Sequence, residues 1–210
     1  MSIQVRVPNA EGTVMKAPEG VEDKYLVLMG DIFPTGYFAA YNAFKNSTSE
    51  QIADQTVVLI GCGPVGLCAL INALEYMPKH LLAVDSVPSR LELAKSLGAE
   101  PWNFMTDRAG LDKRVKELTN GRGADAVIEV VGLSPALRTA YELLRPWGTI
   151  SSVGVHNAEV SVKILVIRTK TNLYWVYRSL GMATMPTTRT SPSRWAVVPS
   201  GPSPTRPSRC

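Results

Sequence analysis

Cysteine and histidine are scarce in this chain, which has three cysteines and two histidines among 210 residues. Cys62, Cys68 and Cys210 are odd in number and show no C-x-x-C spacing, so the sequence predicts neither a disulfide framework nor a cysteine zinc cluster. We expect Cys62 and Cys68 to act as small buried hydrophobic residues. His80 and His156 stand in no metal-ligand motif, and we expect structural roles for both.

Long apolar runs are also missing. No stretch reaches the roughly 18 to 20 uncharged residues that a membrane span needs. The first ten residues, MSIQVRVPNA, lack the apolar core of a signal peptide. With 45% hydrophobic and 19% charged residues, the composition is typical of a globular protein, and the length suffices for one good core or two small ones. We therefore expect a cytoplasmic protein that does not bind membranes.

Acidic residues are absent from position 160 onward, where the chain carries eight Lys or Arg. The formal net charge of +4 therefore divides into +8 for this segment, which leaves −4 for residues 1–159. The last 29 residues contain six Pro and ten Ser or Thr without a period of 2 or 3.6, which is typical of disorder. We expect a disordered tail over residues 181–210, and its charge is no evidence that the body binds nucleic acid.

The central part of the chain contains a strand, a glycine turn and a helix in the order that a dinucleotide requires. Residues 56–60, TVVLI, form a short β-branched run without charge, which is typical of a strand buried on both faces of a parallel sheet. Gly61, Gly63 and Gly66 fill the glycine positions of G-x-G-x-x-G, which serve a tight turn, close approach to a pyrophosphate and tight packing of helix on strand. The helix expected over residues 65–75 would point its free N–H groups at the phosphates.

An acidic residue at the end of the next apolar run selects the dinucleotide. Asp85 follows residues 81–84 and lies 19 residues after Gly66, close to the spacing of about 20 expected for a carboxylate that binds ribose. Such a carboxylate accepts hydrogen bonds from ribose hydroxyls and repels a 2′-phosphate, so the sequence favours NAD over NADP. Two alternatives stay open: a glycine turn that only packs a βα unit, and a site for S-adenosylmethionine. A site for S-adenosylmethionine usually has an acidic residue in its first strand, and residues 56–60 contain none.

Strands and helices alternate with short loops in the rest of the body. Helices are expected over residues 88–97, 111–118 and 135–144, strands over residues 124–131, 149–155 and 172–177, and a short strand or loop over residues 99–104. This alternation predicts an α/β fold with a doubly wound parallel sheet of the Rossmann type. Ligands of such sheets bind at the carboxyl ends of the strands.

The N-terminal segment follows a different pattern. Residues 1–20 contain two candidate short strands, QVRV and GTVMKAP, and are interpreted as the last piece of a β-rich domain whose beginning is absent. A helix is expected over residues 21–33, a break at residues 34–36 and a second helix over residues 37–44. Asp31 stands among apolar neighbours, where burial of an unpaired carboxylate is costly, so it either caps the following helix or meets a cation.

Five blocks of sequence are characteristic of a known family. They are GDIFPTGYFAAYNAF at 30–44, VVLIGCGPVGLCAL at 57–70, VDSVPSRLELAKSLGA at 84–99, GADAVIEVVG at 123–132 and LLRPWGTISSVGV at 143–155. Over about residues 1–180 the chain resembles the zinc-dependent medium-chain alcohol dehydrogenases, near their formaldehyde-dehydrogenase-like branch. That family pairs a GroES-like substrate domain, which supplies a catalytic zinc site, with a Rossmann NAD(P) domain.

The resemblance implies three parts and a set of residue roles. Residues 1–44 would be a remnant of the GroES-like catalytic domain with linking helices, 45–180 the Rossmann NAD-binding domain and 181–210 the tail. Thr35 resembles the threonine that packs beside the nicotinamide, and Asp31 resembles a third zinc ligand. The cofactor-binding residues that the resemblance implies are Gly61, Gly63, Pro64, Val65 and Gly66 at the pyrophosphate, Asp85 at the ribose, Arg90 at the adenosine, and Val131, Gly132, Val153 and Val155 beside the ribose and carboxamide. For Arg90, a solvated helix residue is an equal alternative.

The sequence also departs from its family. The Cys and His that complete the catalytic zinc site, and the four-cysteine structural lobe, belong to a part that is not present. After about Gly181 the family would supply closing segments of the substrate domain, whereas this sequence becomes rich in Pro, Ser, Thr and Arg. Both departures suggest a truncated gene model or a splice variant. We therefore expect NAD binding without a complete zinc site and without alcohol turnover by this chain alone. In the whole family the reaction is hydride transfer between a small alcohol or aldehyde and NAD. Family members commonly form homodimers through the sheet edge, an edge that the altered final strand at residues 172–177 could disrupt here. A non-catalytic nucleotide-binding or interaction module, whose tail recruits a partner, is the alternative function.

Overall fold

The computed structural model describes residues 6–155 and 172–175. The chain divides into two units, Met1–Arg178 and Ser179–Cys210, and everything reported below belongs to the first. The tail expected over residues 181–210, together with His156 and Cys210, lies outside the described residues.

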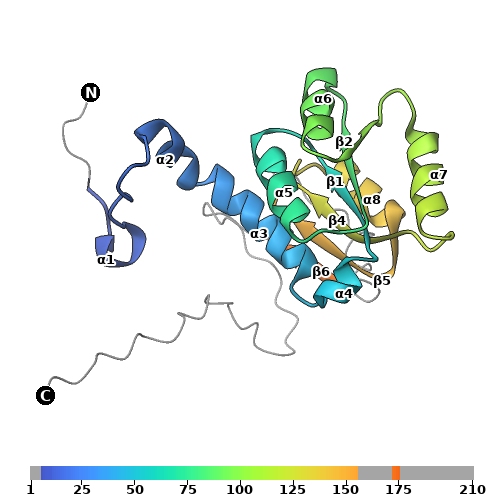
Figure 1. The fold of residues 1–210 in the computed structure, drawn as a ribbon, viewed down its shortest axis with the longest axis horizontal. Coiled ribbons are helices and arrows are strands. Elements are labelled where there is room, and N and C mark those ends of the chain that lie inside the picture. Colours follow the sequence, from blue (N-terminus) through green and yellow to red (C-terminus); the bar gives the residue numbers. More distant parts are fainter. Residues whose placement is uncertain (1–5, 156–171, 176–210) are drawn as a thin grey trace, which may run out of the picture. The chain divides into compact units, whose positions relative to one another are not determined.

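Six parallel strands form one sheet in the order β3-β2-β1-β4-β5-β6 (Figure 1). They are β1 (Thr56–Ile60), β2 (His80–Asp85), β3 (Glu100–Asn103), β4 (Ala124–Glu129), β5 (Leu144–Ser152) and β6 (Asn172–Trp175). Val57 of β1 pairs with Leu81 of β2 on one side and with Ala126 of β4 on the other. The strand order therefore reverses between β1 and β4, which confirms the predicted doubly wound topology and marks the position where ligands bind in such sheets.

Eight helices accompany the strands in the described part of the chain. They are α1 (Ala10–Thr13), α2 (Asp23–Met29), α3 (Ile32–Phe44), α4 (Ser49–Ile52), α5 (Pro64–Glu75), α6 (Pro88–Ser96), α7 (Arg108–Leu118) and α8 (Ser134–Leu143). The helices expected near 65–75, 88–97, 111–118 and 135–144 correspond to α5 to α8. None of the described helices combines the length and the apolar character that a bilayer crossing requires.

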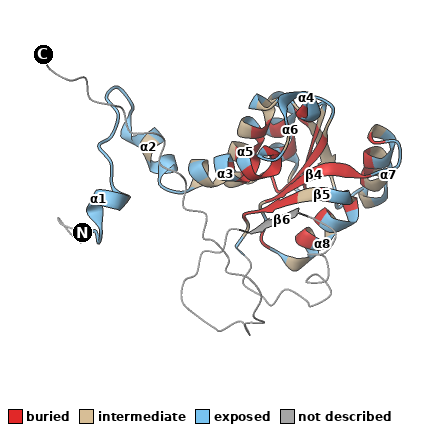
Figure 2. Cartoon of the chain, turned by 90° about the horizontal axis from the view of Figure 1, so that it is seen from below, coloured by how far each residue is buried: buried red, intermediate tan, exposed pale blue. Residues whose placement is uncertain are grey.

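Successive residues of the central strand face opposite sides of the sheet, as the period of 2 requires. Val57 and Leu59 belong to a core shared with α3, α5 and α6, whereas Val58 and Ile60 belong to a second core shared with α7 and α8. Figure 2 shows β4 buried, whereas α7 and α8 carry both buried and exposed residues. Because both faces are covered, the uncharged run at residues 56–60 is explained by burial.

The end of β4 and the start of β5 differ from those expected for identifiable reasons. β4 ends at Glu129 because the side chain of Glu129 accepts the amides of the next turn, which then cannot join the sheet ladder. β5 begins at Leu144, five residues before the expected start, since Ala124 pairs with Leu144 across an irregularity in the register. The exposed Trp147 lies in this stretch and has a φ of 61°.

Residues 6–20 form no strand, contrary to expectation. The described part of this segment contains only the single helical turn α1, and the side chains reported for residues 6–20 are exposed. A strand needs a neighbour to pair with its backbone groups, and no strand of the described sheet pairs with these residues. The first residues of the candidate strand QVRV lie outside the described part.

The expected break at residues 34–36 is also wrong. α3 runs through Pro34 and Gly36, and the chain breaks instead between Met29 and Ile32. Pro34 is tolerated because the first-turn N–H groups of a helix have no intrahelical acceptor. At Gly36 an added Cβ would lie 2.6 Å from the Cβ of Cys68, so this glycine allows α3 to approach α5 closely.

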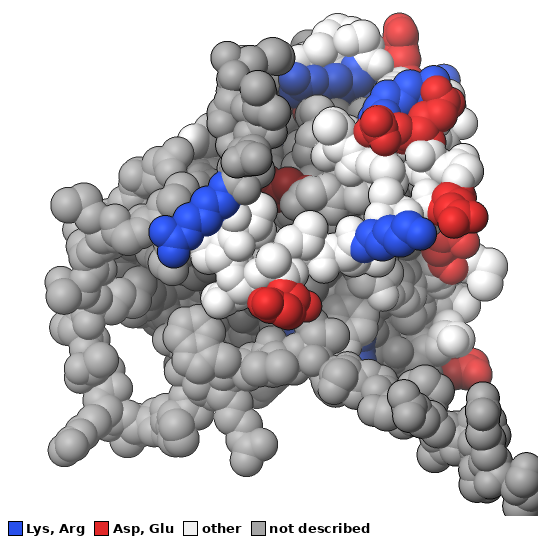
Figure 3. Space-filling model, turned by 90° about the vertical axis from the view of Figure 1, so that its left-hand side faces the viewer, with Lys and Arg blue, Asp and Glu red and all other residues white. Residues whose placement is uncertain are grey.

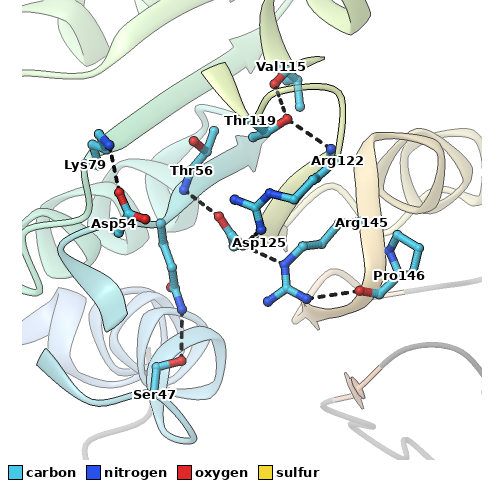
Figure 4. Close-up of polar contacts among 12 residues, drawn as sticks. Ser47, Asp54, Thr56, Lys79, Val115, Thr119, Arg122, Asp125, Arg145 and Pro146 are labelled. Atoms are coloured by element: carbon cyan, nitrogen blue, oxygen red, sulfur yellow. Dashed lines mark hydrogen bonds and ion pairs between the residues drawn. The ribbon is translucent and has the colours of Figure 1, made fainter. Parts of the chain in front are cut away.

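A polar network closes the sheet at the amino end of β4. Asp125 is 7% exposed, and its carboxylate accepts the amide of Thr56 at 2.9 Å and Nε of Arg145 at 2.6 Å. Arg122 approaches the same carboxylate at 3.7 Å, and Figure 4 shows both arginines directed at it. Asp125 thus fixes one end of β4, at the edge of the sheet opposite its carboxyl ends.

Candidate nucleotide-binding cleft

A cleft of about 490 Å³ lies at the carboxyl ends of β1, β2 and β4. This volume falls within the roughly 300 to 1,000 Å³ of ordinary ligand pockets. Eight of the residues that the sequence assigns to the cofactor line it: Gly61, Gly63, Pro64, Val65, Gly66, Asp85, Arg90 and Val131. The sequence did not single out its remaining walls, which include Ser86, Phe104, Leu133 and Thr139.

The glycine turn has the geometry that its motif requires. Gly61 has a φ of 98°, and its amide donates to the carbonyl oxygen of Val84 at 2.8 Å. An added Cβ at Gly66 would lie 1.9 Å from the carbonyl oxygen of Gly61, so any other residue there would collide with the backbone. Gly63 differs from both, since an added Cβ would meet nothing within 4 Å. Of the three positions, Gly63 is the one that faces open space in the cleft.

The first turn of α5 faces the same cleft. Gly63 is its N-cap and Pro64 its first residue, and the amide of Leu67 is the first to find a helical acceptor, the carbonyl oxygen of Gly63 at 2.8 Å. The amides of Val65 and Gly66 precede it and have no intrahelical acceptor by helix geometry. These amides, with the positive end of the helix dipole, favour an anion by about 0.3 to 1 kcal/mol at an exposed site.

Asp85 braces the glycine turn in addition to lining the cleft. Its carboxylate accepts the amide of Cys62 at 2.7 Å through Oδ2, and the amides of Ser86 and Val87 at 2.7 and 2.9 Å through Oδ1. Nη1 of Arg90 lies 3.7 Å from Oδ2, and Asp85 is 7% exposed. The spacing from Gly66 predicted that this acid and the turn lie together, and the contact with Cys62 shows that they do.

The two described cysteines show no sign of nucleophilic chemistry. Burial, with a smaller effect of the Asp85 carboxylate, raises the pKa of the Cys62 thiol to about 12. Burial also raises the pKa of the Cys68 thiol. Cys62 is fully buried and Cys68 half-buried, so the prediction of a packing role is confirmed for Cys62 and holds in part for Cys68.

A second buried acid supports the opposite side of the cleft, and sequence reasoning missed it. Glu129 is 0% exposed and accepts the amides of Val131 and Gly132 at 2.8 and 2.7 Å through Oε1. Its Oε2 accepts the hydroxyl of Ser152 at 2.6 Å. From the sequence alone this strand was expected to continue to residue 131, so Glu129 could not be recognised as its last residue.

Three residues predicted to bind the cofactor do not line the cleft. Gly132 is held behind Val131 by Glu129, and an added Cβ at Gly154 would lie 2.1 Å from the Gly132 nitrogen. Val153 is buried, and its amide donates to the carbonyl oxygen of Glu129 at 3.0 Å. Val155 is exposed. In this structure Gly132 and Val153 support the wall rather than form its surface.

Asp31 and Thr35 lie together on α3, outside the cleft lining. Asp31 stands at the N-cap position of α3, one of the two alternatives, but makes no side-chain capping hydrogen bond; its carboxylate accepts the hydroxyl of Thr35 at 3.0 Å. Asp31 is exposed, so its carboxylate avoids the cost of burial among apolar neighbours. Among the described residues, no three His, Cys, Asp or Glu side chains gather to hold a metal ion. His80 begins β2, where its amide donates to the carbonyl oxygen of Gln55.

The charges of the described body are mixed rather than sorted by sign. On the face shown in Figure 3, basic and acidic side chains lie close to one another. Several are paired, including Arg114 with Glu100, whose Nε and Oε1 atoms are 2.7 Å apart. The excess of basic residues over acidic ones is confined to positions from 160 onward.

Comparison with known proteins decides the family. A model of the zinc-binding dehydrogenase family matches residues 64–187, which is more than half of the chain. The chain belongs to the zinc-binding dehydrogenases. It is 86% identical over 156 residues to zinc-type alcohol dehydrogenase B of Aspergillus flavus, an alignment that covers 74% of this chain and 36% of that protein. It is 54% identical over 154 residues to the medium chain reductase/dehydrogenase ucsI of Acremonium sp, an alignment that covers 73% of this chain and 53% of that protein.

Solved structures agree with this assignment. The zinc dependent alcohol dehydrogenase 2 of Streptococcus pneumonia, in its apo form, is 35% identical with a TM-score of 0.67 over 82% of this chain and 48% of that one. Alcohol dehydrogenase TADH of Thermus sp. ATN1 is 30% identical with a TM-score of 0.66, and the match covers 81% of this chain and 48% of that one. The predicted membership of the zinc-dependent medium-chain alcohol dehydrogenases and the Rossmann fold are therefore confirmed. The chain spans about a third to a half of the length of these relatives.

Proposed function

We propose that the cleft at the ends of β1, β2 and β4 binds NAD(H). The observation that carries this proposal is the open position at Gly63, which lies at the N-terminus of α5 in the same cleft as the carboxylate of Asp85. A dinucleotide needs an anion site and a ribose acceptor side by side. The described residues therefore fit this cofactor.

Each part of the cleft has a separate task in this proposal. The amides of Val65 and Gly66 donate to the pyrophosphate, and Gly63 leaves room for it. Asp85 already accepts three amides, and a carboxylate offers about four lone-pair sites, so it can still accept a ribose hydroxyl. Its negative charge disfavours a 2′-phosphate, and Arg90 beside it serves the adenosine side. The bound cofactor supplies the hydride acceptor or donor at its nicotinamide.

We propose further that the whole protein is an oxidoreductase acting on a small alcohol or aldehyde. Its relatives bear the names of alcohol dehydrogenases, and the chain covers 36% of the A. flavus protein. The proposed division is a remnant of the catalytic domain at residues 1–44, a cofactor domain at 45–180 and a tail beyond, with Thr35 beside the nicotinamide and Asp31 as a zinc ligand. Because the described residues offer no set of three metal ligands, no step is assigned to zinc, and we expect this chain alone to bind NAD(H) without alcohol turnover.

The test is a comparison of three ligands by thermal unfolding of the full chain. At about 100 times its dissociation constant, a ligand stabilises the native state by roughly 2.7 kcal/mol, or about 5 to 10 °C in Tm for a chain of this size. NADH should give this shift, with a smaller one for NADPH at equal concentration. A shift with S-adenosylmethionine and none with NADH would overturn the proposal.

Three further expectations stay predictions: a homodimer formed through the sheet edge, a cytoplasmic location, and no binding of nucleic acid. β6 is the last strand of the described sheet on its side, so the dimer would form there. Sedimentation velocity over a concentration series would measure the oligomeric state. A monomer at every concentration would contradict the first prediction.

A further inference from the structure

Asp85 and Glu129 end the two strands that flank β1, and their hydrogen bonds follow one plan. Each carboxylate accepts two amides from the turn after its own strand, and each accepts one donor from a neighbouring strand end. These donors are Ser86, Val87 and the amide of Cys62 for Asp85, and Val131, Gly132 and the hydroxyl of Ser152 for Glu129. The glycine turn after β1 therefore lies between two turns that are each held by a carboxylate.

Glu129 does not reach the cleft itself. It is 0% exposed and is absent from the cleft lining, whereas Val131, whose amide it accepts, forms part of that lining. Val131 in turn packs on the glycine turn, since its Cγ2 lies 2.8 Å from the position of an added Cβ at Gly61. A chain of contacts thus runs from Glu129 through Val131 to Gly61.

We propose that Glu129 is a positioning residue for cofactor binding. By accepting the Val131 and Gly132 amides it preforms the β4 side of the cleft and holds the glycine turn in the conformation that receives a pyrophosphate. Without this acceptor the part-buried amide of Val131 and the buried amide of Gly132 lose their partner, and the turn must move to satisfy them. The effect on affinity rests on the proposed NAD(H) function, whereas the effect on the turns can be measured without ligand.

The experiment compares the full chain with three variants. Glu129→Ala removes the acceptor, and Glu129→Gln retains Oε1 for both amides. Asp125→Asn is the matched control, because Asp125 is a buried acid at the other end of the same strand and contacts neither turn. Calorimetric titration gives the dissociation constant for NADH, at a temperature where each variant is folded. Amide hydrogen exchange of the free protein reports on residues 61–66 and 130–132.

We expect Glu129→Ala to weaken NADH binding by about tenfold or more, which corresponds to the loss of one or two buried hydrogen bonds. Exchange should become faster at both turns. Glu129→Gln should stay within about threefold of the parent, because its amide oxygen replaces the lost acceptor. Asp125→Asn should lower stability and leave both readouts at the two turns unchanged.

Two results would overturn the proposal: unchanged exchange at residues 61–66 in Glu129→Ala, or an equal change in Asp125→Asn. If the parent does not bind NADH, the proposed function fails, and the exchange data alone decide the positioning role. If Glu129→Ala does not fold, Ser152→Ala replaces it, since it removes the hydroxyl donor to Oε2. Exchange should then be faster at residues 130–132, and unchanged exchange there would count against the proposal.

Discussion

Gly63→Asp should separate folding from binding at the N-terminus of α5. Gly63 is the N-cap and has an extended backbone with a φ of −71°, which an N-cap Asp adopts readily. Nothing lies within 4 Å of its added Cβ, so the side chain fits without moving a neighbour. The free energy of unfolding should therefore stay level or rise by up to about 1 kcal/mol, through capping and the helix dipole.

Binding should respond in the opposite direction. The new carboxylate would stand in the space proposed for the pyrophosphate, and two like charges about 4 Å apart repel by about 4 kcal/mol at an effective dielectric constant of 20. Even half of that repulsion, about 2 kcal/mol, weakens binding about 30-fold. Higher salt should restore part of the loss.

Urea unfolding and NADH titration of the same preparations make the comparison. Gly63→Ala isolates the steric contribution, and Gly12→Asp adds the same charge at another open glycine that does not line the cleft. NADH affinity of Gly63→Asp within threefold of the parent would refute the assignment of the pyrophosphate. A loss of stability above about 1 kcal/mol would refute the open geometry at Gly63.

Other predictions concern the frame of the fold. Trp147 is 72% exposed and has a φ of 61°, a backbone conformation that costs a non-glycine residue about 1 to 2 kcal/mol. Trp147→Gly should therefore raise the free energy of unfolding by up to about 1 kcal/mol in urea unfolding. An equal gain from Trp147→Ala would contradict the backbone explanation. Gly36→Ala should destabilise by about 1 to 3 kcal/mol, because its Cβ would lie 2.7 Å from the backbone nitrogen of Ala69, and an unchanged Tm would argue against this packing. The folded pKa of Cys62, about 12, exceeds its ordinary value of 9.0, so the unfolded state loses this proton first as pH rises. Stability should therefore fall between about pH 9 and 12, by at most about 1.4 kcal/mol per pH unit, and Cys62→Ala should remove that part of the slope.

The glycine turn and its acid could be predicted from sequence because their constraints are local or regularly spaced. Gly61 needs a positive φ and Gly66 needs a missing side chain, and both requirements restrict the residue type at that position. Asp85 follows at the spacing that one helix and one strand impose. The uncharged run at residues 56–60 likewise reports burial on both faces.

The roles of Glu129 and Gly36 could not be predicted, because they depend on contacts between distant segments. In the sequence Glu129 is only a polar residue within an apolar strand. In the structure its carboxylate accepts hydrogen bonds from Ser152 and from the turn after β4. In the sequence Gly36 indicates a break between helices, whereas in the structure it allows α3 to pack closely against α5. The strands expected within residues 1–20 failed for a related reason, since alternation alone does not supply a neighbouring strand.

The central claim is that a dinucleotide occupies the cleft between the glycine turn and Asp85. Hydrogen exchange of the full chain with and without saturating NADH locates the ligand most directly, because its footprint does not depend on any substitution. Binding in this cleft should slow exchange at residues 61–67 and 85–87, with little change in α7. Protection confined to other segments, or none at saturating NADH, would contradict it.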